Sequence, residues 1–371
     1  MAIKVVIATR VLEGVFGGLE RQLREISEAL CDMEFEVHLL YLSHSGEVPF
    51  FNFDRRVIHH KILSQDPQVK ASTLKRISRQ IEIFRVLKTI KADVLVSFMT
   101  GALFLTCLPS KALRIPLILA ERNSPQMYEV TSASKNRYFI FLSMLFARKI
   151  TTQFSEYIDK YPFYIRKKFV VIPNAIPREI LTLAPNVKLE SRKLTYLFAG
   201  RFSFQKRIDL LVKAFGEFAG RNSNVTLKIF GSGPNFTLIQ GQIEGLDLDE
   251  RVILCPPSTN LAREILQADV LCIPSLWEGF PNVLLESLYL GVPGLGFSNC
   301  DGVRHLIVDG KNGWLAEYIE DGSSLVSLLE RSYLDLKSGK SMSKDCHESV
   351  KDFIPEKVYS KWQDLILEIA R

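Results

Sequence analysis

The sequence predicts an α/β protein made of two doubly wound domains, each built on a parallel sheet. Short aliphatic or β-branched runs recur between amphipathic helical stretches, which is the pattern of βα units. This series ends in a segment rich in proline and charge, and a second series of the same kind starts after it. The 371 residues also suit two domains, because one domain typically has about 100–200 residues.

The first series predicts an N-terminal domain over residues 1–176. Its expected strands are 4–9, 36–41, 57–61, 94–98, 117–119, 149–152 and 169–172. An apolar stripe at helical spacing over residues 19–30 predicts a helix after the first strand, and a second stripe predicts a helix over residues 74–90.

The second series predicts a C-terminal domain over residues 194–350, after a linker at 177–193. Its expected strands are 194–199, 225–230, 252–254, 270–273 and 292–297. The last predicted helix covers about residues 355–370 and has one apolar face, made of Val358, Trp362, Leu365 and Ile369.

The charge is distributed unevenly along the chain. Residues 1–180 hold 26 basic and 17 acidic residues, whereas residues 181–371 hold 21 basic and 24 acidic ones. The basic first half fits an anionic partner: a membrane surface, a phosphate-bearing substrate or nucleic acid. A solvated basic surface with no partner is the alternative. Aromatic residues interleaved with cations are sparse, so nucleic acid is not an expected partner.

The sequence argues against export, a membrane span and a metal site. The short strand-like run at residues 2–8 lacks the apolar core and cleavage site of a signal peptide. The most apolar uncharged run, residues 138–147, is shorter than the roughly 20 residues that cross a bilayer, and it is either a core helix or a helix resting on an anionic bilayer. The six cysteines form no CxxC and the six histidines no HxxxH, so we expect reduced cysteines, no metal and a cytoplasmic location.

A candidate anion site follows the strand at 194–199. There Gly200 and Arg201 form a turn, Lys206 follows five residues later, and a helical run begins near residue 210. A glycine turn before a helix is suited to anions, and two nearby cations can converge on a diphosphate. Surface cations beside a turn are the alternative reading.

Two carboxylates follow the strand at 270–273. Glu278 lies in a loop and Glu286 in the helix after it, with Pro281 at the first turn of that helix. Carboxylates accept paired hydroxyl protons, so this pair suits a ligand with two sets of hydroxyls, such as a sugar and a ribose. Two surface carboxylates are again the alternative.

The order of these motifs resembles the retaining glycosyltransferases of family 4, the glycosyl transferases group 1, which have the GT-B fold. The resemblance covers nearly the whole chain and is strongest over residues 194–315. The matching motifs are Gly17-Gly18-Leu19-Glu20, Gly200-Arg201 with Lys206, Gly231-Ser232-Gly233-Pro234, Glu278-Gly279-Phe280-Pro281 with Glu286, Gly291-Val292-Pro293, and Asp309-Gly310 with Gly313.

The resemblance implies a fold and a set of site residues. Two Rossmann-like domains would face each other across a cleft, and residues 351–371 would cross back to the N-terminal domain. Arg201 and Lys206 would hold the donor diphosphate, Glu286 the ribose and Glu278 the donor sugar. The residues expected around the donor are Gly17, Gly18, Gly231, Gly279, Phe280, Pro281, Asn282 and Val283.

The resemblance also implies retention without a metal cofactor, in which the leaving phosphate helps to deprotonate the acceptor. Fixed cations and helix amides stabilise the charge that develops on that phosphate. For the acceptor side, the resemblance indicates Glu121, Arg122 and Asn123, at a place where many relatives have a histidine. A Glu-Arg-Asn string at this place resembles bacterial transferases that build O-antigen, capsule or lipid-linked glycans. A structural turn is the alternative role for these three residues.

We therefore expect a glycosyltransferase that moves a hexose or N-acetylhexosamine from a UDP-sugar to a lipid-linked or polysaccharide acceptor. It would be cytoplasmic and peripherally bound to the inner membrane surface. The rivals are a sugar-nucleotide epimerase or another GT-B enzyme, and a non-catalytic nucleotide- or nucleic-acid-binding module.

Overall fold

The structure, a computed structural model, describes residues 2–12, 17–43, 49, 51–63, 72–185 and 193–370. The chain divides into two compact units. Unit 1 consists of Met1–Ala175 and Glu356–Arg371, and unit 2 of Ile176–Pro355. Residues 186–192 of the expected linker lie outside the described residues.

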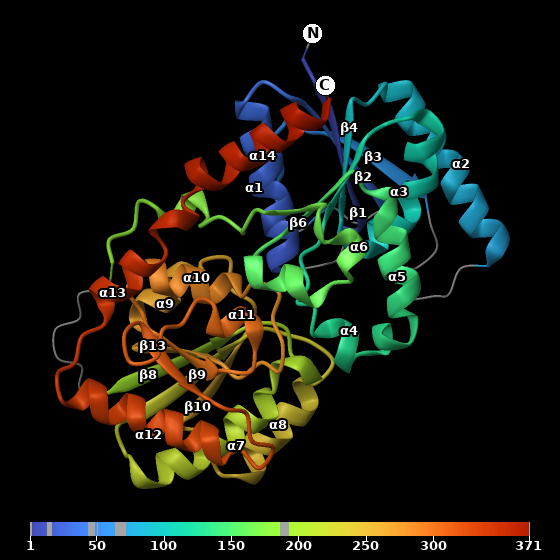
Figure 1. Cartoon of the computed structure of the whole chain (residues 1–371). Helices are drawn as coiled ribbons and strands as arrows, with labels where there is room; N and C mark the ends of the chain where they lie inside the picture. Colours follow the sequence, from blue (N-terminus) through green and yellow to red (C-terminus); the bar gives the residue numbers. More distant parts are fainter. Residues whose placement is uncertain are drawn as a thin grey trace. The chain divides into compact units, whose positions relative to one another are not determined.

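Unit 1 is built on a parallel sheet of seven strands in the order β3-β2-β1-β4-β5-β6-β7 (Figure 1). The strands are β1 (Lys4–Val11), β2 (Glu36–Ser43), β3 (Ile58–Leu63), β4 (Val94–Phe98), β5 (Leu117–Ala120), β6 (Lys149–Thr152) and β7 (Phe169–Val171). The helices are α1 (Gly18–Asp32), α2 (Thr73–Ile90), α3 (Met99–Leu113), α4 (Met127–Val130), α5 (Arg137–Ser143), α6 (Phe163–Arg166) and α14 (Pro355–Ala370), with 3-10 turns η1 (Ser132–Asn136), η2 (Met144–Phe146) and η3 (Ser155–Lys160).

Unit 2 is built on a parallel sheet of six strands in the order β10-β9-β8-β11-β12-β13. The strands are β8 (Leu194–Ala199), β9 (Val225–Phe230), β10 (Val252–Cys255), β11 (Val270–Ile273), β12 (Gly294–Phe297) and β13 (Gly313–Ala316). The helices are α7 (Ile208–Arg221), α8 (Phe236–Gly245), α9 (Leu261–Gln267), α10 (Asn282–Tyr289), α11 (Asp301–Arg304), α12 (Ser323–Lys337) and α13 (Ser343–Ser349), with 3-10 turns η4 (Arg178–Ile180), η5 (Phe204–Lys206) and η6 (Lys351–Phe353).

The last helix completes the core of unit 1. The predicted apolar face of α14 is buried together with strand residues such as Val5 and Ile7. Arg122 contributes to this packing, because its guanidinium carbon lies 5.3 Å from the Trp362 ring centroid and 5.9 Å from that of Phe98. Unit 1 is therefore assembled from both ends of the chain.

The predicted fold class is confirmed, and five of the predicted strands have the predicted bounds. The strand predicted at 292–297 starts only at Gly294, and β13 was not predicted. Glycine explains the second miss: a Cβ at Gly313 would lie 2.1 Å from the Gly294 carbonyl oxygen, so this pair of strands needs residues with low strand propensity.

The apolar run at residues 138–147 is neither wholly core nor wholly exposed. Ile140, Phe141 and Met144 are buried, whereas Tyr138 and Phe139 lie on the surface. No helix in the described part of the chain is both long and apolar enough to span a membrane.

Candidate functional site

The candidate site of unit 2 lies where its strand order reverses. β8 is the central strand, with β9 on one side and β11 on the other. In a doubly wound sheet, the loops after such neighbouring strands diverge and leave room for a ligand at the carboxyl edge. The two segments singled out from sequence, at 200–206 and 274–286, follow β8 and β11. The topology therefore brings both to one edge.

The glycines after β9 let the loop after β8 approach closely. A Cβ at Gly231, which has φ 147°, would lie 2.0 Å from the Gly200 carbonyl oxygen. The loops are joined by the Phe202 amide, which donates to the Ser232 carbonyl oxygen at 2.8 Å. Gly231 is buried in this contact, so a larger residue there would push the two loops apart.

The loops after β8 and β11 are held together by contacts between residues far apart in sequence. The Leu276 amide donates to the Gln205 carbonyl oxygen at 2.9 Å, and Gln205 Nε2 donates to the Trp277 carbonyl oxygen at 2.5 Å. One residue further along each loop, Lys206 Nζ lies 2.5 Å from Glu278 Oε1. The structure thus joins the predicted phosphate cation to the predicted sugar carboxylate.

Glu278 is buried and held in place by a second donor. Ser275, which is fully buried, donates from Oγ to Glu278 Oε1 at 2.7 Å. Charge-assisted hydrogen bonds of this kind fix a carboxylate more strongly than neutral ones. The carboxylate is therefore preorganised before any ligand binds.

Arg201 differs from Lys206 in its surroundings. Its side chain is exposed and has no ion pair within the described ranges of the chain. An exposed cation next to the carboxyl edge is available to an anion at little desolvation cost. The two predicted phosphate ligands thus form one cation that already has a partner and one that has none among these residues.

Helix α10 carries the remaining residues predicted for the donor. Pro281 is its N-cap, Asn282 and Val283 form its first turn, and Glu286 lies one turn further on and is buried. Residues three and four apart share one face of a helix, so Glu286 lies behind Asn282 and Val283. Before α10, Gly279 is partly exposed, while the Phe280 ring packs edge-on against Phe353 at 5.6 Å.

The residues predicted in unit 1 follow the ends of two strands. Gly17 is the N-cap of α1 and Gly18 its first residue, after β1. Glu121, Arg122 and Asn123 follow β5.

Glu121 and Arg122 both have partners within unit 1. Glu121 is fully buried and accepts hydrogen bonds from the Tyr128 hydroxyl at 2.6 Å and the Asn123 amide at 2.9 Å, and burial raises its pKa. Arg122 donates to the Ile172 carbonyl oxygen at 2.7 Å, and burial lowers its pKa to about 10. Of the three, Asn123 presents a side chain that is not engaged in these contacts.

A comparison with protein families identifies the domain that carries the unit 2 site. Residues 182–345 match the family described as "Glycosyl transferases group 1". These residues are a group 1 glycosyltransferase domain. The resemblance inferred from the motifs is thereby confirmed.

Two relatives show how far the similarity extends. The chain is 27% identical over 365 residues, 95% of its length and 96% of the other's, to GalNAc-alpha-(1->4)-GalNAc-alpha-(1->3)-diNAcBac-PP-undecaprenol alpha-1,4-N-acetyl-D-galactosaminyltransferase of Campylobacter jejuni. It is 26% identical over 291 residues, 78% of its length, to exopolysaccharide phosphotransferase SCO2592 of Streptomyces coelicolor, and spans 30% of that protein.

Solved structures share the fold of the whole chain. Sucrose-phosphate synthase of Thermosynechococcus elongatus aligns with a TM-score of 0.82 at 16% identity, over 99% of both chains. Anabaena Alr3699/HepE in complex with UDP and glucose aligns with a TM-score of 0.77 at 15% identity, over 99% of this chain and 100% of the other.

The glycosyltransferase domain contains positioning residues that the motifs did not single out. Arg207, directly after Lys206, has φ 45° and is held by Asp209 at 3.2 Å and by the Tyr318 hydroxyl. Arg207 thereby fixes a left-handed backbone that residues other than glycine seldom adopt. A Cβ at Gly302 would lie 2.6 Å from the Glu278 carbonyl oxygen, so α11 can approach Glu278 only with glycine there.

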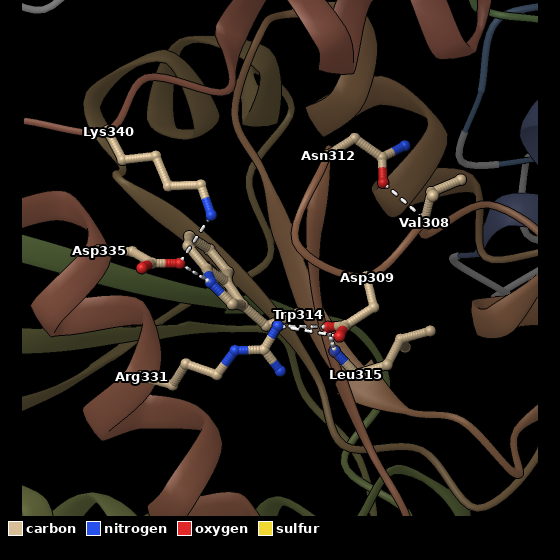
Figure 2. A network of polar contacts seen from close by, with 8 residues as sticks. All are labelled: Val308, Asp309, Asn312, Trp314, Leu315, Arg331, Asp335 and Lys340. Atoms are coloured by element: carbon tan, nitrogen blue, oxygen red, sulfur yellow. Dashed lines mark hydrogen bonds and ion pairs between the residues drawn. The ribbon is translucent and has the colours of Figure 1, made fainter.

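The last matching motif of the glycosyltransferase domain, Asp309-Gly310 with Gly313, forms a structural turn (Figure 2). Asp309 Oδ1 accepts hydrogen bonds from the Leu315 amide at 2.8 Å and Arg331 Nη2 at 2.9 Å. Burial raises the pKa of Asp309, but the hydrogen bonds from Arg331 and Leu315 together lower it by more than burial raises it, so the pKa lies below its usual value. Gly310 supplies the left-handed conformation, with φ 74°.

Among the described residues, no group of three or more His, Cys, Asp or Glu side chains is placed to hold a metal ion. Asp247 and Asp249 are two carboxylates close in sequence that could be considered as metal ligands. They lie between α8 and β10, where Asp247 has φ 56°, and do not follow β8 or β11 as the other site residues do.

Proposed function

We propose that this chain is a retaining glycosyltransferase that transfers a hexose or N-acetylhexosamine, of the GalNAc, GlcNAc or galactose type, from a UDP-sugar. The acceptor would be a lipid-linked glycan or polysaccharide of a bacterial surface glycan, reached from the cytoplasm at the inner membrane. The observation that carries the proposal is the Lys206–Glu278 pair beside the exposed Arg201 at the carboxyl edge of β8 and β11.

The chemistry asked of these residues is charge stabilisation and positioning. The bond between the sugar anomeric carbon and the β-phosphate oxygen breaks, and a new bond to the acceptor oxygen forms on the same face of the sugar. The acceptor proton passes to the departing phosphate, so UDP carries away the electron pair and the proton. Arg201 and Lys206 would stabilise the charge that grows on that phosphate.

The other site residues would bind the parts of the donor that do not react. Glu278, preorganised by Ser275, would accept protons from donor-sugar hydroxyls, and Glu286 would do so for the ribose. Binding energy of this kind orients the anomeric carbon before the reaction.

The relatives support the substrate classes. The Campylobacter enzyme is named for transfer of N-acetylgalactosamine to an undecaprenol-linked acceptor, and the Anabaena protein was solved with UDP and glucose. We infer a UDP-sugar donor and a lipid-linked acceptor for this chain by that analogy.

The first test is binding of nucleotides in the presence of EDTA. We expect UDP to raise the melting temperature when GDP, ADP and NAD do not, since a ligand at 100 times its dissociation constant stabilises the fold by about 2.7 kcal/mol. If another nucleotide raised the melting temperature instead, the inferred donor would be a sugar bound to that nucleotide. If UDP raised the melting temperature without EDTA but not with it, metal-independent binding would be contradicted.

The second test is transfer by Lys206→Ala, with Lys213→Ala as the matched control. Lys213 lies on α7 of the same unit, and its Nζ donates to the Asp321 carbonyl oxygen at 3.2 Å. Lys206→Ala should lower kcat/KM more than tenfold, because it removes a charge contact to the leaving group, and Lys213→Ala should leave it unchanged. Equal rates for both variants would refute the assignment of Lys206 to the phosphate.

The rival functions give different results in the same assay. An epimerase would convert the UDP-sugar with no acceptor present. The melting temperature of a binding module would rise with UDP, but the module would consume no donor. A sugar-phosphate synthase, as the similarity to sucrose-phosphate synthase allows, would use a soluble sugar acceptor in place of a lipid-linked one. The stereochemistry of the product, read by NMR, tests retention.

A further inference from the structure

Three carboxamide side chains follow three neighbouring strands of unit 1. Asn123 comes after β5, Gln153 directly after β6, and Asn174 after β7. The three strands are parallel and adjacent in the sheet, so their carboxyl ends lie at one edge. The fold therefore brings three neutral groups to that edge, each of which can donate and accept hydrogen bonds.

The Gln153 amide is buried without a hydrogen-bond partner. The residue is 2% exposed, and neither its Oε1 nor its Nε2 has a partner among the residues that the structure describes. An unpaired buried polar group destabilises a fold, so most such groups are paired in native proteins. A ligand that supplies both missing partners explains why glutamine stands at this position.

The two charged residues that follow β5 are bound within the unit. Arg122 donates from Nη1 to the Ile172 carbonyl oxygen at 2.7 Å and from Nη2 to Thr151 Oγ1 at 2.9 Å. Arg122 Nη1 also lies 3.5 Å from Asn174 Oδ1, so this cation holds one of the three amides. The Glu121 carboxylate accepts two hydrogen bonds from the segment that follows it. The groups that these strand ends leave for a ligand are therefore amides rather than charges.

We propose that Gln153 recognises the acceptor of the sugar transfer through an uncharged group of a sugar, a hydroxyl or an acetamido group. Either group both donates and accepts hydrogen bonds, as Nε2 and Oε1 of Gln153 require. A phosphate mainly accepts at neutral pH and would leave Gln153 Oε1 unpaired. This role rests on the proposed function, in which unit 2 binds the donor and the ligand of this edge is the acceptor. Gln153 then selects an acceptor whose reacting sugar is uncharged.

The test measures transfer by the full chain from UDP-galactose, UDP-N-acetylglucosamine and UDP-N-acetylgalactosamine. The acceptors are the octyl glycosides of the same three sugars and the 6-phosphates of these glycosides. We expect a neutral glycoside to be the preferred acceptor, with a kcat/KM at least tenfold above that of its 6-phosphate. Gln153→Leu should raise the acceptor KM about tenfold and change kcat little, since it removes two hydrogen bonds that hold the acceptor in both the ground state and the transition state.

Two further readouts separate this role from a structural one. The melting temperature of Gln153→Leu should equal or exceed that of the wild type, because an apolar side chain of similar size replaces an unpaired buried amide. UDP should raise the melting temperature of both proteins equally, and the donor KM should not change.

The matched control is Gln80→Leu, on α2 of the same unit. Gln80 Nε2 donates to the Phe104 carbonyl oxygen at 2.7 Å, and its Oε1 is likewise buried with no partner in the described part of the chain. Gln80 does not follow a strand of the sheet. Its replacement should therefore leave the acceptor KM at the wild-type value.

An unchanged acceptor KM in Gln153→Leu would overturn the proposal, and a lower melting temperature in the same variant would then mean that an ordered water pairs the amide. A raised donor KM would place Gln153 against the donor and would also overturn it. A wild type that prefers the 6-phosphates would contradict the choice of an uncharged acceptor. Absence of transfer in every pairing would instead refute the proposed function, and the role of Gln153 would fall with it.

Discussion

Asn312 shows how one buried side chain holds the turn before β13. Its Oδ1 accepts from the Val308 amide at 2.7 Å, and its Nδ2 donates to the Leu306 carbonyl oxygen and to Ser349 Oγ, each at 2.9 Å. Asn312→Ala leaves buried groups without partners, which costs about 1–3 kcal/mol each. We expect a lower melting temperature for unit 2, measured by calorimetry. Asn224→Ala, at an exposed position before β9, is the control and should melt as the wild type does.

The sequence identifies candidate site residues, but it does not predict which of them contact one another. The motifs identify Lys206 and Glu278, but these residues lie 72 positions apart, and only the strand order places them at hydrogen-bonding distance. Ser275 and Arg207 carry no motif of their own, because their importance comes from what they hold and not from their type. The roles assigned to the site residues, Lys206 and Glu278 included, stay predictions.

Edge strand β3 is joined to β2 by a histidine pair, which makes this element sensitive to pH. His38 Nδ1 lies 2.9 Å from His60 Nε2, and His38 Nε2 lies 3.0 Å from Glu36 Oε1. Because the Glu36 carboxylate accepts a hydrogen bond from His38 Nε2–H, Nδ1 of neutral His38 accepts a hydrogen bond from His60 Nε2–H. Protonation of His38 would turn its Nδ1 into a donor that faces the His60 Nε2–H donor, and the hydrogen bond between the two rings would be lost.

This geometry predicts that unit 1 loses stability in mild acid. Burial lowers the pKa of His38, His59 and His60, so each binds protons less readily in the fold than in the unfolded chain. Their contribution is therefore present above the unfolded pKa of about 6.5 and is lost as the pH falls below it. The melting temperature should drop between pH 7.5 and pH 5.5, and His60→Gln should reduce that drop. An identical drop in His60→Gln would contradict the role of the pair.

Elements were predicted best where burial on both faces produces a continuous apolar run. β4, β8 and β11 are largely apolar and buried strands of this kind, and their bounds match. Helix α2 shows the limit, since its sequence has apolar residues on two faces and periodicity alone does not say which face meets the sheet. β13 shows another limit, because its register depends on the close approach of two glycines from different strands.

At the scale of the whole molecule, the pairing of the chain ends decides how unit 1 is completed. The motif resemblance, but not the periodicity, led us to expect the last helix to return to the N-terminal domain. Unit 1 takes in Glu356–Arg371, and Val358, Trp362 and Leu365 are buried in its core. Unit 2 is made of one continuous stretch of chain and has no such dependence.

A chain that ends at residue 355 should therefore lose unit 1 selectively. Removal of α14 exposes the face of the sheet that the Trp362 ring covers, and loss of one such aromatic side chain alone typically costs about 3–5 kcal/mol. In hydrogen exchange, we expect amides of β1 and β4 to lose protection while those of β8 and β11 keep it. Trp362→Ala in the full chain should give a weaker version of the same pattern. Uniform loss of protection in both units would mean that unit 2 needs unit 1 in order to fold, and uniform retention would mean that α14 contributes little to the core that contains it.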